Sequence, residues 1–95
     1  MIHELVWGKG FERAFKKTTK HKPSLHNQIF SILELLAENP FHPSLDTHKL
    51  KGKLEGLWAC TVSYDCRIVF ELVREKSSNR ELILLVDIGT HEEVY

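Results

Sequence analysis

The sequence has few of the features that mark several large classes of protein. Its 95 residues include only two cysteines, Cys60 and Cys66, which is too few for the disulfide framework of a small secreted domain. No apolar run approaches the ~20 residues that a membrane-spanning helix needs. The first ten residues lack the basic and apolar regions of a secretion signal. We therefore expect a cytoplasmic protein with reduced thiols.

The length and the missing motifs narrow the possibilities further. A chain of 95 residues supports one small hydrophobic core, so we expect a single domain over residues 1–95. The sequence contains no glycine-rich phosphate loop, no serine-centred nucleophile elbow, and no histidines and cysteines at the spacing of a zinc site. It therefore predicts no metal site and no cofactor.

The charges are unevenly distributed, although the formal net charge is zero. Residues 1–22 contain six basic and two acidic residues, a net charge of +4, and residues 48–56 contain three lysines and one glutamate, a net charge of +2. Phosphate binding depends on local potential, so both segments are candidates for contact with a polyanion. The alternative is that the first segment is simply a solvated face.

Hydrophobic periodicity predicts two helices that follow one strand and precede three more. Apolar residues recur at helical spacing over 10–20 and again from Pro23 to about Glu38, just before Pro40. β-Branched and aromatic runs predict the strands. The predicted strands are 2–7, 57–64, 66–74 and 81–88, with a turn at Ser77, Ser78 and Asn79 between the last two.

This order, β-α-α-β-β-β, predicts an α+β fold in which a two-helix hairpin packs on a mostly antiparallel sheet. A polar connection over residues 39–56 separates the helices from the last three strands. Loops longer than ~12 residues are often functional in small domains, so this connection is a candidate for part of a site.

A few polar residues stand at the ends of the predicted strands, where a site could form. They are His48, Asp65, Arg67, His91 and Tyr95. Each also has a structural explanation, because Asp65 suits a turn, Arg67 suits the surface of an edge strand, and His91 follows the last strand. The residues alone therefore do not decide between chemistry and structure.

Three segments together resemble the RelE/ParE superfamily of bacterial toxins. They are His-Lys-Leu-Lys-Gly-Lys-Leu-Glu-Gly-Leu-Trp (48–58), Tyr-Asp-Cys-Arg-Ile-Val-Phe-Glu (64–71) and Asp-Ile-Gly-Thr-His-Glu-Glu-Val-Tyr (87–95). Within the superfamily, the chain is most similar to the YafQ-like mRNA interferases. The resemblance implies a RelE-like fold and the toxin of a type II toxin–antitoxin system. It also implies a ribosome-dependent endoribonuclease whose partners are a cognate antitoxin, mRNA and the ribosomal A site.

The resemblance also implies roles for individual residues. His48, Asp65 and His91 match positions that the YafQ branch uses for acid–base work, and Tyr95 matches its terminal aromatic residue. Arg67 matches the arginine that RelE proper uses against the scissile phosphate. The sequence departs from the branch at Thr61, where relatives carry a further histidine, and at Asp87, where they often carry an arginine.

Cleavage of RNA by its own 2′-hydroxyl needs a base, a cation that offsets the charge on the phosphorane, and an acid for the leaving 5′-oxygen. We expect His48 or Asp65 to be the base, Arg67 to bind the phosphate, and His91 to be the acid. Tyr95 is expected to stack on a nucleobase. The lysines of the connection, Lys49, Lys51 and Lys53, are expected to hold backbone phosphates.

Two alternatives remain open. A ParE-like inhibitor of DNA gyrase would share the fold but has no need of His48 and His91 together, so this pair favours the nuclease. A non-catalytic homologue that only docks an antitoxin is favoured by the neutral net charge and by Thr61 and Asp87.

Overall fold

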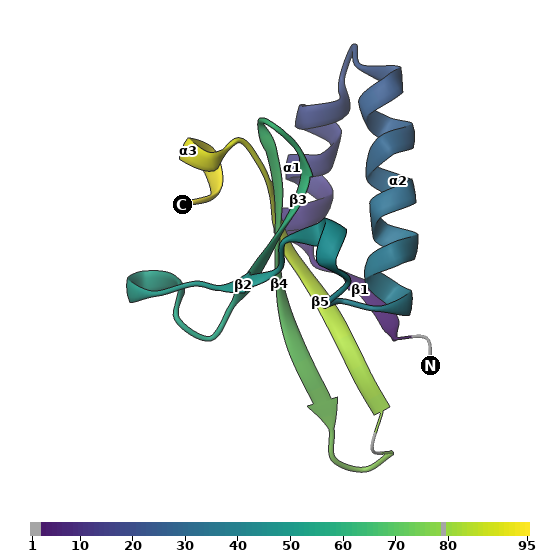
Figure 1. The fold of residues 1–95 in the computed structure, drawn as a ribbon, viewed down its shortest axis with the longest axis vertical. Helices are drawn as coiled ribbons and strands as arrows, with labels where there is room; N and C mark the ends of the chain where they lie inside the picture. Colours follow the sequence, from purple (N-terminus) through teal and green to yellow (C-terminus); the bar gives the residue numbers. More distant parts are fainter. Residues whose placement is uncertain (1–2, 79) are drawn as a thin grey trace.

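The computed structural model describes residues 3–78 and 80–95, which form one five-stranded sheet with helices on both of its faces (Figure 1). The strands run in the order β1-β5-β4-β3-β2, with β1 parallel to β5 and every other pair antiparallel. The predicted α+β class and mostly antiparallel sheet are confirmed. The elements are β1 (Glu4–Trp7), α1 (Lys9–Thr19), α2 (Pro23–Glu38), β2 (His48–Lys49), β3 (Trp58–Ser63), β4 (Cys66–Glu75), β5 (Arg80–Gly89) and α3 (His91–Val94).

The core lies between the sheet and the hairpin of α1 and α2, as the periodicity predicts. Every side chain in this layer that is almost completely buried is apolar. Each fully buried Leu, Ile or Phe contributes about 1.5–3 kcal/mol to folding. The buried residues include Phe11 and Phe15 of α1, Ile29, Leu33 and Leu36 of α2, and Cys60, Ile68, Phe70, Ile83 and Leu85 of the sheet.

The chain leaves β1 for α1 through Gly8, where a close approach excludes any side chain. The Gly8 amide donates a hydrogen bond of 3.0 Å to the carbonyl oxygen of Leu85 on β5. A Cβ atom at Gly8 would lie 2.7 Å from that same oxygen. The glycine therefore lets the first turn of α1 sit directly against β5, beyond the end of β1.

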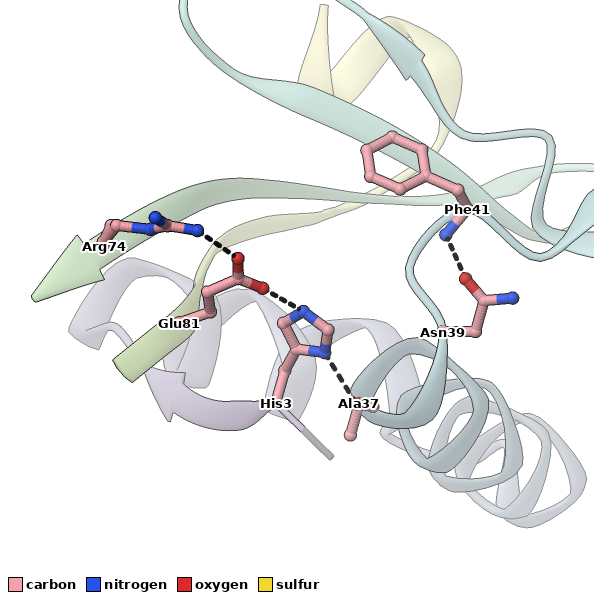
Figure 2. Close-up of polar contacts among 6 residues, drawn as sticks. All are labelled: His3, Ala37, Asn39, Phe41, Arg74 and Glu81. Atoms are coloured by element: carbon pink, nitrogen blue, oxygen red, sulfur yellow. Dashed lines mark hydrogen bonds and ion pairs between the residues drawn. The ribbon is translucent and has the colours of Figure 1, made fainter. Parts of the chain in front are cut away.

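A polar cluster joins the start of β1 to the end of α2 and to the β4–β5 hairpin (Figure 2). The His3 ring lies 3.2 Å from the Ala37 carbonyl oxygen through Nδ1, and 2.7 Å from the Glu81 carboxylate through Nε2. Arg74 donates to the other Glu81 oxygen at 2.8 Å. The bonds from Arg74 and His3 lower the pKa of the Glu81 carboxyl. Both partners of His3 are acceptors, so only the doubly protonated ring makes both bonds.

Two short elements were not predicted, β2 and α3. The connection over residues 39–56 contains β2 and two 3₁₀ turns, Pro43–Leu45 and Gly52–Leu54, so it is more ordered than a polar loop. The predicted helix and strand bounds agree with the structure within one or two residues. Ile2 of the predicted first strand and Asn79 of the predicted turn lie outside the described residues. Within the described ranges, no helix is long and apolar enough to cross a membrane.

Candidate functional site

Helix α3 packs on the face of the sheet that α1 and α2 leave open (Figure 1). Val94 of α3 is buried against Ala59 of β3 and Val69 of β4. His48 of β2 pairs with Ala59, and residues paired across two strands point to the same face. His48 and α3 therefore share this face.

Arg67 belongs to the same face. Arg67 pairs with Thr61 on one side and with Gly89 on the other. Because side chains alternate along a strand, Arg67 points to the face of Val69, two residues further along β4. The sheet register thus brings together His48, Arg67 and the helix that carries His91, which are far apart in the sequence.

A capping box fixes α3 at the end of β5. The Thr90 hydroxyl accepts a hydrogen bond of 3.2 Å from the Glu93 amide, and the Glu93 carboxylate accepts one of 2.8 Å from the Thr90 amide. Hydrogen bonding to the carboxylate, first from the Thr90 amide and then from the Thr90 side chain, lowers the pKa of the Glu93 carboxyl. Gly89 makes room for this arrangement, because a Cβ atom there would lie 2.9 Å from Oε1 of Glu93.

Helix α3 presents His91 and Tyr95 together. Their ring centroids are 4.5 Å apart and the rings meet at 86°, an edge-to-face contact. Burial is the main cause that raises the pKa of the Tyr95 phenol. The positive charge of Arg67 lowers this pKa, and the negative charge of Asp46 raises it further. Tyr95 is 41% exposed, so part of its ring remains available to a ligand.

The hydrogen bond of His48 determines which of its nitrogens is free. Nδ1 lies 3.0 Å from the carbonyl oxygen of Asp46, which can only accept, so Nδ1 carries the proton. In the neutral ring, Nε2 then holds a lone pair. The His48 side chain is exposed, which leaves this nitrogen open to a substrate.

Arg67 is held by the β3–β4 turn through a single nitrogen. Its Nη1 donates to the carbonyl oxygens of Ser63 at 2.6 Å, Tyr64 at 3.2 Å and Cys66 at 3.1 Å. Among the described residues, Nε and Nη2 make no hydrogen bond. The guanidinium is therefore braced on one side and free on the other.

Asp65 lies elsewhere, at the tip of the β3–β4 hairpin. Its carboxylate accepts a long hydrogen bond of 3.4 Å from the Ser63 hydroxyl. It lines a hollow together with Lys22 of the α1–α2 connection and with Thr90 and Glu93 at the start of α3. Within the described residues, no hydrogen bond or ion pair joins Asp65 to His48, Arg67 or His91.

The three lysines of the connection are exposed but differ in their surroundings. The Lys49 ammonium lies 5.3 Å from the centre of the Trp58 ring, a cation–π contact that accounts for its position. Lys51 is the N-cap of the second 3₁₀ turn, and Lys53 lies within that turn. Both follow β2 in the sequence.

Sequence reasoning missed the residues that orient α3. The spacing of Thr90 and Glu93 is the sequence signature of a capping box, and it could have predicted both the helix and its start. Thr61 departs from the family pattern, yet its pairing with Arg67 brings it beside that residue. That pairing depends on the sheet register and has no local signal.

A family model described as the bacterial toxin of a type II toxin–antitoxin system, YafQ, matches residues 3–95. The chain belongs to the YafQ family. It is therefore a toxin of the YafQ/RelE type, as the resemblance of its three segments implies. No curated protein sequence matches it at a comparable level of significance.

Solved structures similar to this toxin have the same fold. YafQ from Escherichia coli is 20% identical, with a TM-score of 0.78 and 98% of each chain covered. The E. coli DinJ–YafQ toxin–antitoxin complex matches at 16% identity with a TM-score of 0.76, covering 100% of this chain and 99% of the other. A copper-bound variant of a toxin from Helicobacter pylori is 28% identical, with a TM-score of 0.70 and complete coverage of both chains.

Proposed function

We propose that this toxin is an endoribonuclease that cleaves mRNA on the ribosome through attack of the RNA 2′-hydroxyl. One observation supports the proposal: His48 and Arg67 share a face of the sheet with Val94 of α3, the helix at whose ends His91 and Tyr95 stand in ring contact. The two histidines, the arginine and the tyrosine supply a base and an acid, a phosphate ligand and a stacking surface. The YafQ family membership supports the same chemistry.

The proton transfers follow from the two histidines. Nε2 of His48 takes the 2′-proton as the 2′-oxygen attacks phosphorus, and the bond from phosphorus to the 5′-oxygen breaks. His91, as the imidazolium, gives its proton to the departing 5′-oxygen. The products are a 2′,3′-cyclic phosphate and a 5′-hydroxyl. Imidazole suits both steps because it titrates near neutral pH.

His48 is a better base than Asp65 in this geometry. His48 shares the open face with Arg67, whereas Asp65 lies at the tip of the β3–β4 hairpin, where it lines a hollow with Lys22. The free Nε and Nη2 of Arg67 would face the charge that builds up on the phosphorane. Side chains then supply both the charge neutralisation and the proton transfer. Within the described residues, no three His, Cys, Asp or Glu side chains gather in a group that could hold a metal ion.

Tyr95 and the lysines would hold the RNA around the scissile bond. The exposed part of the Tyr95 ring is suited to stacking on a base. Lys51 and Lys53 extend from the connection that carries His48 and would contact backbone phosphates. Lys49 is already engaged with Trp58, so its contribution is expected to be smaller.

We also propose that a cognate antitoxin protein binds this toxin, as DinJ binds YafQ in the E. coli complex. Beyond α3, no helix covers the open face of the sheet among the described residues. Val6 on that face is 38% exposed. A partner that covers this face would block access to His48 and Arg67.

The test is cleavage of mRNA on ribosomes by His91→Ala, measured in single-turnover reactions. Loss of a proton-transfer group is expected to slow cleavage by about 10²- to 10⁴-fold. Glu92→Ala is a matched control, because Glu92 is exposed on the same helix and should leave the rate unchanged. An unchanged rate in His91→Ala would contradict the proposed acid. Intact mRNA together with gyrase–DNA cleavage complexes in cells that express the toxin would favour the gyrase alternative.

A further inference from the structure

The tip of the β3–β4 hairpin and the α1–α2 connection lie at the same end of the molecule, opposite the β4–β5 turn (Figure 1). Lys17, Lys20 and Lys22 line a hollow of about 190 Å³ together with Asp65 of the tip and with Thr90 and Glu93 of the α3 cap, so three cations face two carboxylates there. This surface lies beyond the open face that carries His48. None of the roles proposed above uses Lys20 or Lys22.

The hairpin tip presents an aromatic ring that packs on nothing. Tyr64 is 97% exposed, more than any other large hydrophobic side chain of the described residues. Its backbone is nevertheless fixed, because the Tyr64 carbonyl oxygen accepts a hydrogen bond from Nη1 of Arg67. A solvent-exposed ring on a braced turn offers both of its faces to a ligand, and a nucleobase stacks on such a face.

Helix stability does not explain the nearby lysines. Cations in the last turn of a helix interact favourably with the negative end of its dipole, which accounts for Lys16 and Lys17 in α1. Lys22 is the N-cap of α2, where a positive charge is unfavourable, and the first turn of α2 has no acidic residue. Lys20 and Lys22 form no ion pair with a carboxylate of the described residues. Between them, His21 adopts a left-handed conformation with φ of 65°, which is uncommon for a residue other than glycine.

We propose that Tyr64, Lys20 and Lys22 form a second RNA-binding site, which stacks one unpaired base on Tyr64 and holds neighbouring phosphates with the lysines. The choice of RNA as the ligand rests on the proposed function. Arg67 connects the two sites, since its Nη1 braces the tip while its Nε and Nη2 make no hydrogen bond among the described residues. RNA fits better than an acidic peptide, because a fully exposed flat ring suits a base, whereas a peptide side chain needs an apolar groove.

The experiment measures binding of a single-stranded RNA of about 12 nucleotides by fluorescence anisotropy. Every 2′-hydroxyl of this RNA is methylated, so that it cannot be cleaved. Tyr64→Ala is expected to weaken binding by about 5- to 100-fold, and Tyr64→Phe should retain it. The double variant Lys20→Ala/Lys22→Ala should reduce the slope of log affinity against log salt by about 1.4, for two phosphates. Lys9→Ala/Lys76→Ala removes the same charge elsewhere and should leave the slope unchanged.

The outcomes separate this site from the proposed catalysis. If the tyrosine and lysine variants bind RNA like the wild type, the second site is wrong, even if His91→Ala abolishes cleavage. If they lose RNA binding while His91→Ala still cleaves at the normal rate, the second site stands and the catalytic proposal fails. Loss of antitoxin binding with unchanged RNA binding would make this surface a protein interface and would overturn the proposal. All three side chains are exposed, so the melting temperatures should match that of the wild type.

Discussion

The rings of His91, the first residue of α3, and Tyr95, its C-cap, meet edge to face with their centroids 4.5 Å apart. The two residues are separated by four positions in the sequence. Residues at this spacing are neighbours on one side of a helix. Tyr95 is 41% exposed, so more than half of its surface is packed. The better-packed ring therefore restricts the orientation of the exposed imidazole, which is the proposed acid.

Tyr95→Ala should slow mRNA cleavage by about 2- to 10-fold through loss of this ring contact alone, since such pairs are worth about 0.5–1.5 kcal/mol. Loss of base stacking would add to that effect. Tyr95→Phe keeps the ring and should cleave nearly like the wild type in the same single-turnover assay on ribosomes. If the phenylalanine variant is as slow as the alanine variant, the hydroxyl rather than the ring is what matters.

Gly89→Ala should displace α3 and lower both stability and activity. The added Cβ atom would lie 2.9 Å from Oε1 and 3.1 Å from Cβ of Glu93, too close for either to remain in place. Strain of this kind costs about 1–3 kcal/mol. Urea denaturation gives the stability, and ribosomal cleavage gives the activity.

Gly10→Ala is the matched control for that experiment. Its added Cβ atom would lie 3.4 Å from the Val86 carbonyl oxygen, and the position is helical. Because alanine favours helix by about 1 kcal/mol over glycine, this variant should be at least as stable as the wild type. Equal losses from both substitutions would contradict the specific role of Gly89.

The capping box of α3 predicts a dependence of stability on pH. Hydrogen bonds from Thr90 lower the pKa of the Glu93 carboxyl in the folded protein, so its ionised form stabilises the fold above the usual glutamate pKa. This contribution is lost as the pH falls through the lower, folded-state pKa. Glu93→Gln keeps an acceptor for the cap but does not titrate. The melting temperature of the wild type should exceed that of Glu93→Gln at pH 7, and the difference should shrink towards pH 3.

Long periodic segments were predictable from the sequence, and short elements were not. The apolar spacing of Phe11 and Phe15 predicts α1, and Pro23 correctly places the start of α2. β2 has only two residues and is a strand only because it pairs with β3. α3 has four residues, too few for a periodic pattern, although its capping box could be recognised in the sequence.

The candidate site depends on contacts between distant parts of the chain. That His48 shares a face with α3 follows from its pairing with Ala59 and from the packing of Val94 on Ala59, and neither contact has a local signal. Asp65 lies in the β3–β4 turn, outside the paired residues, so the register does not place it beside His48. The resemblance named the residues, and the fold decides which of them are near one another.

The two cysteines should be almost unreactive in the folded protein. Burial, the main cause, raises the pKa of Cys60 to about 12 and that of Cys66 to about 11. At pH 8 the thiolate fraction is then about one in 10⁴ for Cys60 and one in 10³ for Cys66, and the thiolate is the reactive form. Ellman's reagent should label neither thiol within minutes in buffer, Cys66 should react first on longer exposure, and both should react at once in guanidinium chloride. Labelling in buffer at the rate of the unfolded chain would mean that the α1–α2 layer opens readily over Cys60 and Cys66.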